Sequence, residues 1–298
     1  MSKLQRSSIV GLSLSKIVEL ALAEDIGPGD LTSQIFAHET RPRRAIFLAK
    51  QAGVLSGSEV VREVFHQLDP SSRVRMRIRD GQEFRAGDEL LEVRANLVAL
   101  LSGERTALNF LQRLSGIATL TRAYVNALGP KSSIGIYDTR KTTPLLRALE
   151  KKAVCDGGGR NHRFGLFDMV MLKNNHIDAA GSVSAAVAEL VARGVFAASP
   201  RPALCIEARN LDEALEAVSA GADIVMLDNL DLKSIRSIVK KMEAFAHQLG
   251  CRLPEIEVSG GVTIEDVKRL RRLPIQRISV GRLTHSAPAI DISMRIVR

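Results

Sequence analysis

Short apolar runs alternate with amphipathic helical patterns from residue 133 to residue 280. The apolar runs have the length of strands, and the segments between them repeat their apolar residues at helix spacing, with about 20–35 residues per unit. We predict strands at 133–137, 168–172, 203–206, 223–227, 255–258 and 277–280, and helices at 143–154, 181–193, 211–219, 231–249 and 263–272. This alternation is typical of parallel strands with right-handed crossovers. Six units predict an incomplete β/α barrel, since a complete barrel of eight usually takes about 250 residues.

The chain before this alternation has a different pattern. A helix is predicted over 12–24, followed by a break where two glycines flank Pro28. The region from about 44 to 95 is rich in strand patterns and contains a predicted helix at 58–68. Residues 97–129 read as long helical structure with a leucine stripe. The sequence therefore predicts an α+β region ahead of the barrel.

A chain of 298 residues is long enough for two domains with a sizeable core. We expect an α/β protein with an N-terminal α+β sandwich domain of residues 1–115 and a barrel domain of residues 116–283. The closing segment, 284–298, is expected to pack back on the first domain.

The net charge of +9 indicates acidic partners but does not by itself say which. Arg73, Arg75, Arg77 and Arg79 alternate with apolar residues, which predicts a strand with a solvated basic face. Aromatic residues are only 4% of the chain and Trp is absent, so the stacking platforms that bind single-stranded nucleic acid are lacking. Anionic small substrates are therefore favoured over nucleic acid.

Cysteine usage and hydropathy indicate a cytoplasmic protein. The three cysteines lie far apart without paired spacing, so neither a disulfide framework nor a zinc site is predicted. Lys16 and Glu19 interrupt any apolar run near the N-terminus, which argues against a signal peptide. No apolar stretch reaches the roughly 20 residues that span a bilayer, so no membrane partner is expected.

Charged residues or glycines follow nearly every predicted barrel strand. They are Asp138-Thr139-Arg140-Lys141, Lys173, Glu207, Asp228-Asn229, Ser259-Gly260-Gly261 and Gly281. A single charged residue after a strand is more often a helix cap or a solvated loop residue. Enzymes with β/α barrels, however, place their active site at the carboxyl ends of the strands. The repeated pattern therefore predicts one polar mouth and an enzyme.

Five cationic residues lie at strand ends or in the glycine-rich loop GGGRNHR, which suits a substrate with several negative charges. Arg140 and Arg163 can each hold a carboxylate with two parallel hydrogen bonds. His162 can also donate to a carboxylate. Lys141 and Lys173 are suited, as point charges, to pyrophosphate or to a reacting carboxylate.

Glu207 and Asp228 are the acids of this cationic mouth. Carboxylates can bind ribose hydroxyls, take part in holding a Mg²⁺ that is bound mainly through pyrophosphate, and stabilise positive charge developing at an anomeric carbon. Alternatively, they form neutralising ion pairs with Lys173 or Arg140.

The sequence Ser259-Gly260-Gly261 precedes a predicted helix. Its backbone N–H groups could cradle a phosphate with the help of the helix N-terminus, and Gly281 would complete the cradle. A plain tight turn is the alternative interpretation of these glycines.

Several long motifs carry a family resemblance. TRKTTP, GGGRNHR and KNNH, in this order and spacing, resemble the quinolinate phosphoribosyltransferases, the carboxylating nicotinate-nucleotide pyrophosphorylases. EDIGPGDLT, GERTALNFLQRLSGIAT, MLDN, SGG and SVGRLTHSAP extend the resemblance over essentially the whole chain. It implies the type II phosphoribosyltransferase fold, in which an incomplete β/α barrel is joined to an α+β domain.

The resemblance also implies a reaction. The pyridine nitrogen of quinolinate attacks C1 of phosphoribosyl pyrophosphate, pyrophosphate leaves through an oxocarbenium-like state, and the C2 carboxylate then leaves as CO₂. Nicotinate mononucleotide, a precursor of NAD, is the product, and Mg²⁺ is the expected cofactor. Lys141, Glu207 and Asp228 are our candidate catalytic residues, with Lys141 near C2 during decarboxylation.

Arg105 is interpreted differently with and without the resemblance. By itself it lies beside Glu104 and is interpreted as half of a helix-surface ion pair. In the resembled family this arginine reaches into the active site of the partner subunit. The resemblance therefore implies a homodimer, and a hexamer built from dimers is also compatible with it.

The chain departs from the family pattern at several positions. Leu145 stands where the family usually has Gly, Asn174 where Asp is frequent, and Cys205 where Glu is typical. Lys152 and Cys155-Asp156 replace the usual Tyr and Arg-Cys. None of these is a predicted substrate residue, but Leu145 bears on the backbone geometry after TTP.

Two alternative functions remain. One is the molybdenum-associated paralogue of the same fold, against which the intact RNHR and KNNH motifs argue. The other is a non-catalytic basic module that binds nucleotides or RNA, which gives no reason for Glu207 and Asp228 in the mouth and predicts a salt-sensitive affinity for nucleic acid.

Overall fold

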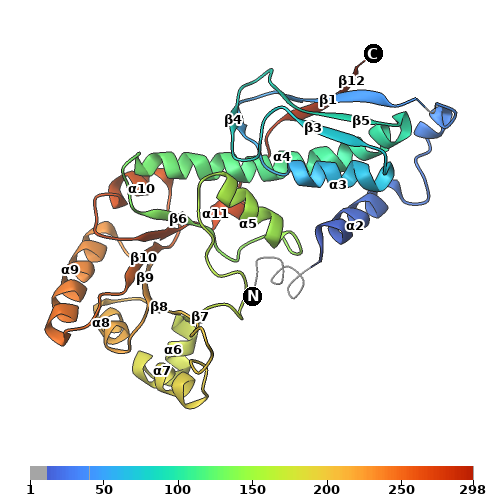
Figure 1. Ribbon diagram of the computed structural model, residues 1–298. Coiled ribbons are helices and arrows are strands. Elements are labelled where there is room, and N and C mark those ends of the chain that lie inside the picture. The colour runs from blue at the N-terminus through green and yellow to red at the C-terminus, as the bar shows by residue number, and fades with distance from the viewer. Residues whose placement is uncertain (1–11, 40, 298) are drawn as a thin grey trace. The chain divides into compact units, whose positions relative to one another are not determined.

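The computed structural model describes residues 12–39 and 41–297 (Figure 1). They form two compact units. The first contains the chain up to Arg122, the segment Thr142–Gly158 and the chain from Leu283 onward. The second contains Ala123–Lys141 and Gly159–Arg282.

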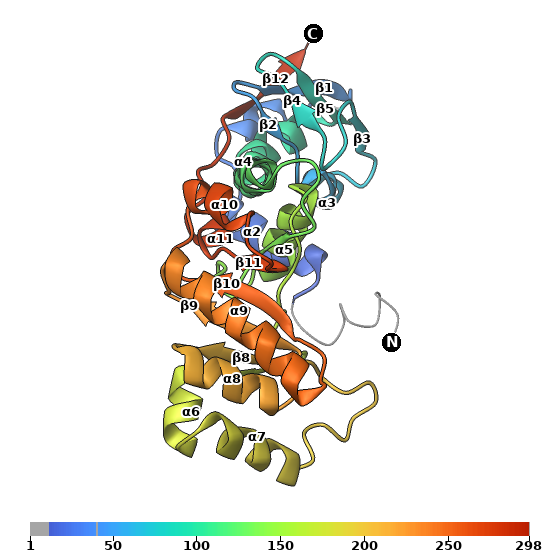
Figure 2. The same cartoon turned by 90° about the vertical axis from the view of Figure 1, so that its left-hand side faces the viewer.

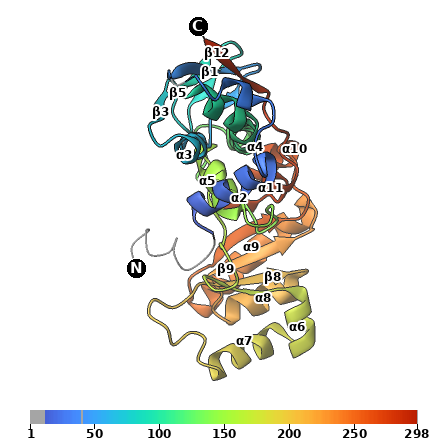
Figure 3. The same ribbon diagram turned by 90° about the vertical axis from the view of Figure 1, so that its right-hand side faces the viewer.

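The first unit is built on a four-stranded antiparallel sheet in the order β12-β1-β5-β3 (Figure 3). Its strands are β1 (Arg43–Ala49), β3 (Arg73–Met76), β5 (Glu89–Ala95) and β12 (Ile292–Val297). The C-terminal strand β12 lies against β1, with Ala45 opposite Ile296. Strand β3 exposes Arg73 and Arg75 while Val74 and Met76 are half-buried, which is the alternation of a strand with one solvated face.

Helix α3 (Ser58–Leu68) and the long α4 (Leu97–Leu128) lie along one face of this sheet (Figure 1), and α2 (Leu14–Ile26) packs against α3. The ring of Phe65 on α3 meets that of Phe47 on β1 edge-on, with centroids 6.2 Å apart. Gly103 on α4 faces Leu68, Phe65 and Val64, and a Cβ there would lie 2.7 Å from Leu68, so the glycine allows α4 to approach α3 closely. A 3₁₀ turn (Ser33–Phe36) and the small pair β2 (Gly53–Val54) and β4 (Glu83–Phe84) complete the unit.

Helix α5 (Arg147–Asp156) packs in the first unit although it follows a barrel strand in sequence. Glu150 on α5 is fully buried, and its Oε1 accepts a hydrogen bond from Nε of Arg113 on α4 at 2.8 Å. The same arginine donates to the carbonyl of Thr284. This ion pair, with its acid buried, ties 142–158 to α4, whereas the predicted barrel domain of 116–283 included that segment.

The second unit contains a six-stranded parallel sheet in the order β6-β11-β10-β9-β8-β7. Its strands are β6 (Gly135–Tyr137), β7 (Val170–Leu172), β8 (Leu204–Ala208), β9 (Ile224–Asp228), β10 (Glu255–Ser259) and β11 (Arg277–Ser279). Strands β6 and β7 are consecutive in sequence but lie at opposite edges. The sheet is therefore open, and the predicted α/β fold with an incomplete barrel is confirmed.

Helices α6 to α9 follow one another beside this sheet (Figure 2). The helices of the unit are α6 (Asn174–Ala180), α7 (Val183–Ala192), α8 (Leu211–Ser219), α9 (Leu232–Leu249), α10 (Ile264–Leu270) and the start of α11 (Arg282–His285). Four of these helices begin after a residue whose side chain accepts a hydrogen bond from a backbone N–H of the first turn. These residues are Ser182 for α7, Asn210 for α8, Asp231 for α9 and Thr263 for α10. Helix α6 was not predicted. It starts directly after Lys173 and ends at Gly181, where φ is +91°.

None of the helices in the described part of the chain combines the length with the apolar composition that crossing a bilayer would require.

Candidate active site

The strand register brings the predicted residues to one edge of the parallel sheet. Leu172 of β7 lies opposite Ile206 of β8, so Lys173 and Glu207 follow at the same level. On the next strands, Asp228 of β9 lies opposite Ser259 of β10. The ends of four adjacent strands therefore present a cation, two acids and the Ser-Gly-Gly turn side by side.

Glu207 is buried between charges of both signs. Its side chain is only 9% exposed, and Nζ of Lys173 lies 3.8 Å from its Oε2. Burial raises the pKa of Glu207, the negative charge of Asp228 raises it further, and Lys173 opposes both effects. The predicted ion pair with Lys173 is present. The register of β8 and β9, with Ala208 opposite Leu227, places Glu207 and Asp228 near the ends of adjacent strands.

Arg140 and Arg163 form the cationic part of the site. Arg163 is only 8% exposed, and its Nη1 donates to the carbonyl of Met169 at 3.2 Å. Burial lowers the pKa of Arg163, and the like charge of nearby Arg140 lowers it further. Two guanidinium groups near one strand end can together bind an anion.

The glycine-rich loop reaches Arg140 because it pairs with the free edge of β6. The N–H of Arg160 donates to the carbonyl of Ile136 at 2.7 Å, and the N–H of Asp138 donates to the carbonyl of Arg160 at 3.1 Å. Oδ1 of the fully buried Asp138 then accepts the N–H of His162 at 2.8 Å. Asp138 thus fixes the turn that places Arg163 beside Arg140.

The His162 ring is directed at protein groups. The side chain is buried, Nδ1 accepts the N–H of Arg163 at 2.7 Å, and Nε2 lies 3.3 Å from Oε1 of Glu257. Glu257, fully buried on β10, also accepts a 2.7 Å hydrogen bond from Nε of Arg277 on β11. Sequence reasoning assigned no role to Glu257 or Arg277. The available signal was an acid between the apolar residues Ile256 and Val258 and an arginine just before Ile278.

The MLDN and SGG motifs hold each other in place. Gly260 has φ +100°, and a Cβ on it would lie 2.4 Å from Oδ1 and 2.6 Å from the backbone N of Asn229. Asn229 has φ +55°, donates its N–H to the carbonyl of Ser259 at 3.2 Å, and donates from Nδ2 to Asp228 at 2.7 Å. Only glycine fits at residue 260, and the same contact orients Asp228.

The start of α10 is capped by its own side chains. Oγ1 of Thr263 accepts the N–H of Asp266, and Oδ2 of Asp266 accepts the N–H of Thr263 at 3.0 Å. The hydrogen bond from the Thr263 hydroxyl lowers the pKa of Asp266, so this helix end already carries a negative charge. A phosphate here would therefore rely on the N–H groups of the glycine turn before Thr263.

The remaining predicted residues lie in three places. Lys141 is exposed just after β6, where its N–H donates to Oγ1 of Thr139 at 3.1 Å. Gly281 follows Val280, whose N–H donates to the carbonyl of Tyr137 at 2.9 Å, so it lies near the end of β6. Arg105 is exposed on α4 in the first unit. Among the described residues, neither Glu104 nor Arg105 takes part in an ion pair.

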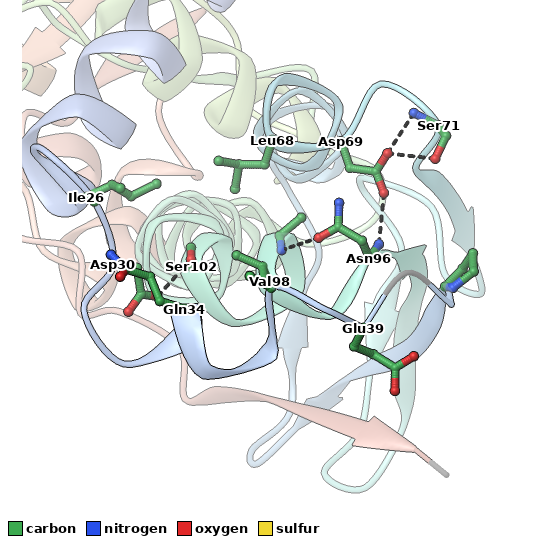
Figure 4. Close-up of a pocket in the computed structure, with 14 residues that line it drawn as sticks. Ile26, Asp30, Gln34, Glu39, Leu68, Asp69, Ser71, Asn96, Val98 and Ser102 are labelled. Carbon is green, nitrogen blue, oxygen red and sulfur yellow. Dashed lines mark hydrogen bonds between the residues drawn. The ribbon is translucent and has the colours of Figure 1, made fainter.

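A cavity of about 710 Å³ lies in the first unit rather than at the sheet edge (Figure 4). Asp30, which lines it, accepts hydrogen bonds from the hydroxyls of Ser33 and Ser102 and from two backbone N–H groups. The Ser33 hydrogen bonds are the main reason that the pKa of Asp30 falls to about 2. Asp69 is held in the same way by Ser71 and Asn96. Both acids are engaged in fixing turns. The described residues that line the cavity include no lysine, arginine or histidine, unlike the sheet edge.

Two family profiles match the chain. They are the quinolinate phosphoribosyl transferase N-terminal domain, over residues 30–115, and the C-terminal domain, over residues 117–295. A probable nicotinate-nucleotide pyrophosphorylase [carboxylating] of Bacillus subtilis is 41% identical over 286 residues, covering 96% of this chain and 94% of the relative. The chloroplastic nicotinate-nucleotide pyrophosphorylase [carboxylating] of Arabidopsis thaliana is 38% identical, covering 95% of this chain and 82% of the relative.

Solved structures agree with these sequence matches. NadC from Streptococcus pyogenes superposes with a TM-score of 0.85 at 40% identity, covering 95% of this chain and 96% of the other. The nicotinate-nucleotide pyrophosphorylase from Francisella tularensis gives a TM-score of 0.84 at 34% identity, with 95% and 96% coverage.

Proposed function

The chain belongs to the quinolinate phosphoribosyltransferase family, and from this we propose that it carries out the family reaction at the carboxyl end of its six-stranded sheet. The activity is that of a carboxylating nicotinate-nucleotide pyrophosphorylase in NAD biosynthesis. Phosphoribosyl is transferred from phosphoribosyl pyrophosphate to quinolinate, and nicotinate mononucleotide, pyrophosphate and CO₂ are formed.

The backbone contacts that hold the loop of Arg163 against the strand end of Arg140 support this site for quinolinate: the N–H of Arg160 donates to the carbonyl of Ile136, and the N–H of His162 donates to Oδ1 of Asp138. Quinolinate carries two neighbouring carboxylates on a planar ring. Each guanidinium can hold one carboxylate through two parallel hydrogen bonds, and a bound dianion offsets the repulsion between the two arginines. Asp138 and His162 act behind them by fixing the loop that carries Arg163.

Phosphoribosyl pyrophosphate is assigned to the neighbouring strand ends. Lys173 faces the pyrophosphate, Glu207 and Asp228 face the ribose, and the 5′-phosphate lies on the turn Ser259-Gly260-Gly261, with Gly281 beside it. Glu207 and Asp228 stabilise positive charge that develops at C1 as pyrophosphate leaves, because both are acids at adjacent strand ends and Glu207 is buried.

Mg²⁺ is compatible with this donor set. Two carboxylates at strand ends, without a third acid or histidine grouped with them in the described part of the chain, suit an ion that keeps most of its bonds to phosphate oxygens and water. Glu207 and Asp228 would hold the ion, which would neutralise charge on the leaving pyrophosphate. We propose Mg²⁺ as the cofactor on this ground.

Lys141 is assigned to the second half of the reaction. After transfer, the pyridinium nitrogen withdraws electrons from the ring, so the C2 carboxylate can leave as CO₂ and the ring carbon takes up a proton. A cation beside C2 stabilises the negative charge on that carbon. Lys141 follows Arg140 directly and is exposed, so it can turn toward a quinolinate held by the arginine.

Arg105 is assigned to the site of a partner subunit in a homodimer. Its exposure on α4, together with the absence of an ion pair to it among the described residues, leaves the guanidinium available to an anion on another chain. A hexamer built from such dimers is compatible with this arrangement. The predicted cytoplasmic location and the absence of a nucleic-acid partner stay predictions.

A product assay tests the proposed function. The protein is incubated with phosphoribosyl pyrophosphate, Mg²⁺ and either quinolinate or nicotinate, and CO₂ and nicotinate mononucleotide are measured. We expect turnover with quinolinate and none with nicotinate, since only quinolinate has both carboxylates. Turnover of neither compound would contradict the assignment and would reopen the molybdenum-associated paralogue and the basic binding module. Turnover of nicotinate would contradict the two-carboxylate site.

A further inference from the structure

A series of contacts among four charged or polar residues runs from the interior of the second unit to the quinolinate-binding position. Arg277 on β11 donates from Nε to Oε2 of Glu257 on β10 at 2.7 Å. Oε1 of Glu257 lies 3.3 Å from Nε2 of His162, and Nδ1 of His162 accepts the backbone N–H of Arg163 at 2.7 Å. The series of contacts therefore ends at one of the two arginines assigned to the carboxylates.

Every member of this series of contacts is shielded from water. Glu257 is fully buried, and His162, Arg163 and Arg277 are 7%, 8% and 8% exposed. Burial alone would raise the pKa of Glu257, but the contacts with His162 and Arg277 outweigh it, so the pKa lies below the ordinary value and the carboxylate is charged. A buried charge is costly, and these partners are what keep it anionic.

The outer side of Arg277 is also fixed. Its guanidinium carbon lies 3.7 Å from the centroid of the Tyr137 ring, and Nη1 is 3.2 Å from Glu255. The arginine is held from two directions, so it can in turn hold Glu257 in one rotamer.

The contacts of its two nitrogens fix the form of the His162 ring: Nδ1 accepts a hydrogen bond, and Nε2 lies within ion-pair distance of Oε1 of Glu257. Because Nδ1 accepts an N–H, it carries no proton, so the proton of the ring is on Nε2, the nitrogen that lies 3.3 Å from Oε1 of Glu257. Glu257 thus selects the ring orientation that lets Nδ1 receive Arg163. If that acceptor is lost, the ring can rotate, and the backbone of Arg163 loses its anchor.

We propose that Glu257 is a positioning residue for quinolinate, which acts through His162 to fix Arg163 and is itself fixed by Arg277. This inference rests on the proposed function, since it takes Arg163 to bind a carboxylate of quinolinate. Neither Glu257 nor Arg277 needs to touch the substrate. The binding of phosphoribosyl pyrophosphate, which is assigned to Lys173 and to the Ser259-Gly260-Gly261 turn, does not depend on this series of contacts.

The test compares Glu257→Gln with Glu255→Gln. Glu257→Gln keeps the shape, but an amide can accept from only one of His162 and Arg277 through its oxygen. Glu255→Gln is the matched control, because Glu255 lies on the same strand and contacts the same arginine without contacting His162. KM for each substrate, kcat and the equilibrium binding of quinolinate alone are measured for both variants and for the unmodified protein.

Glu257→Gln is expected to weaken quinolinate binding and to raise its KM by about tenfold, because the charged contact that orients the His162 ring is lost. The KM for phosphoribosyl pyrophosphate should change less than about twofold, and Glu255→Gln should leave both constants near those of the unmodified protein. A residue that only stabilises the fold would lower the melting temperature without separating the two KM values. Unchanged quinolinate binding in Glu257→Gln, or equal weakening of both substrates, would overturn the proposal.

A second variant guards against misfolding. In the paired change Glu257→Met with Arg277→Met, no unpaired charge is left in the interior, so the unit should fold. His162 still lacks its acceptor, and quinolinate binding should still be weakened; normal binding in this variant contradicts the positioning role. If the unmodified protein binds quinolinate but releases no CO₂, the proposed function fails, while the binding data still decide the role of Glu257.

Discussion

At the scale of single residues, Leu145 shows how a departure from the family pattern can be interpreted physically. The residue has φ +67°, in the left-handed region that glycine adopts freely and leucine does not, and its side chain is 69% exposed. Leu145→Gly should therefore relieve about 1 kcal/mol of strain while losing little burial. Because glycine also makes the unfolded chain more flexible, at a cost of about 0.5–1 kcal/mol, the net gain in unfolding free energy should be at most about 0.5 kcal/mol. Urea unfolding measures it.

Leu166→Gly is the matched control for this prediction. Leu166 is 74% exposed and is not among the described non-glycine residues with positive φ. The same substitution there adds flexibility to the unfolded chain and relieves nothing, so it should lower the unfolding free energy by about 0.5–1 kcal/mol. Equal effects of the two substitutions would show that the conformation of Leu145 carries no strain.

Glu207 predicts a pH-dependent conflict between stability and activity. Its pKa is raised above the ordinary 4.5 by burial and by Asp228, so ionisation of Glu207 disfavours the folded state. Stability that this group contributes in its neutral form is present below pH 4.5 and is lost as the pH rises through the raised pKa. Relative to the unmodified protein, Glu207→Gln should become more stable as the pH rises from about 4 to 8, while kcat at neutral pH falls by about 100-fold.

Glu216→Gln provides the opposite sign in the same titration. Hydrogen bonds from Ser184 lead the interactions that lower the pKa of Glu216, so its ionised form stabilises the fold. That contribution is present above pH 4.5 and is lost as the pH falls through the lowered pKa, so Glu216→Gln should be least stable relative to the unmodified protein at neutral pH. Calorimetric unfolding across the pH range gives both curves, and parallel curves would contradict the assignment for Glu207.

The sequence identified the residues that end strands but not those that support them from within. Glu207 and Asp228 could be predicted because a parallel sheet brings its strand ends together. The role of Glu257 could not be predicted, because it depends on the contact with His162. That histidine belongs to a loop paired with β6, two strands away from β10 in the sheet. No local pattern contains that contact. The same holds for Asp138, whose carboxylate is used by a backbone N–H of the distant loop.

At the scale of elements, the turn after β10 is where a glycine is required by its neighbours. In Gly260→Ala, the new Cβ would lie 2.4 Å from Oδ1 of Asn229, and φ +100° is itself unfavourable for alanine. The end of β9 must then shift, and Asp228 with it. We expect a loss of about 2–3 kcal/mol in unfolding free energy and a rise of at least about tenfold in the KM for phosphoribosyl pyrophosphate.

Gly221→Ala separates backbone strain from the clash. Gly221 has φ +73°, no heavy atom of a residue beyond its chain neighbours lies within 4 Å of the position that a Cβ would occupy, and the residue precedes β9 at the end of the strand away from Asp228. Alanine there should cost about 1 kcal/mol and leave the KM unchanged. A Gly260→Ala protein that behaves like Gly221→Ala would show that the turn is not held by Asn229.

Element prediction succeeded where the pattern is local and failed where packing decides. The alternation of apolar runs and helical patterns was enough to predict six parallel strands connected by helices. Helix α8 (Leu211–Ser219) has the predicted bounds. Helix α6 was missed because its seven residues carry little apolar periodicity. The pattern of α5 predicted a helix, but the buried contact between Glu150 and Arg113, far apart in sequence, decides the unit in which it packs.

At the scale of the whole molecule, the assignment of Arg105 to a partner's site makes a prediction that needs two chains. Arg105→Ala and Glu207→Gln should each abolish most activity. If Arg105 serves the partner, a dimer of one Arg105→Ala chain and one Glu207→Gln chain has both defects in one site and none in the other. Random exchange in an equal mixture would then restore about a quarter of the sites.

The alternative arrangement gives a different result in the same experiment. If Arg105 acted within its own chain, every site of the mixed dimer would carry one defect, and mixing would restore nothing. The matched control mixes Arg105→Ala with the double variant Arg105→Ala and Glu207→Gln, in which no intact site can form. If activity recovers in the first mixture and not in the control mixture, an active site must contain residues of two chains. The parallel-sheet unit of one chain then depends on helix α4 of the other.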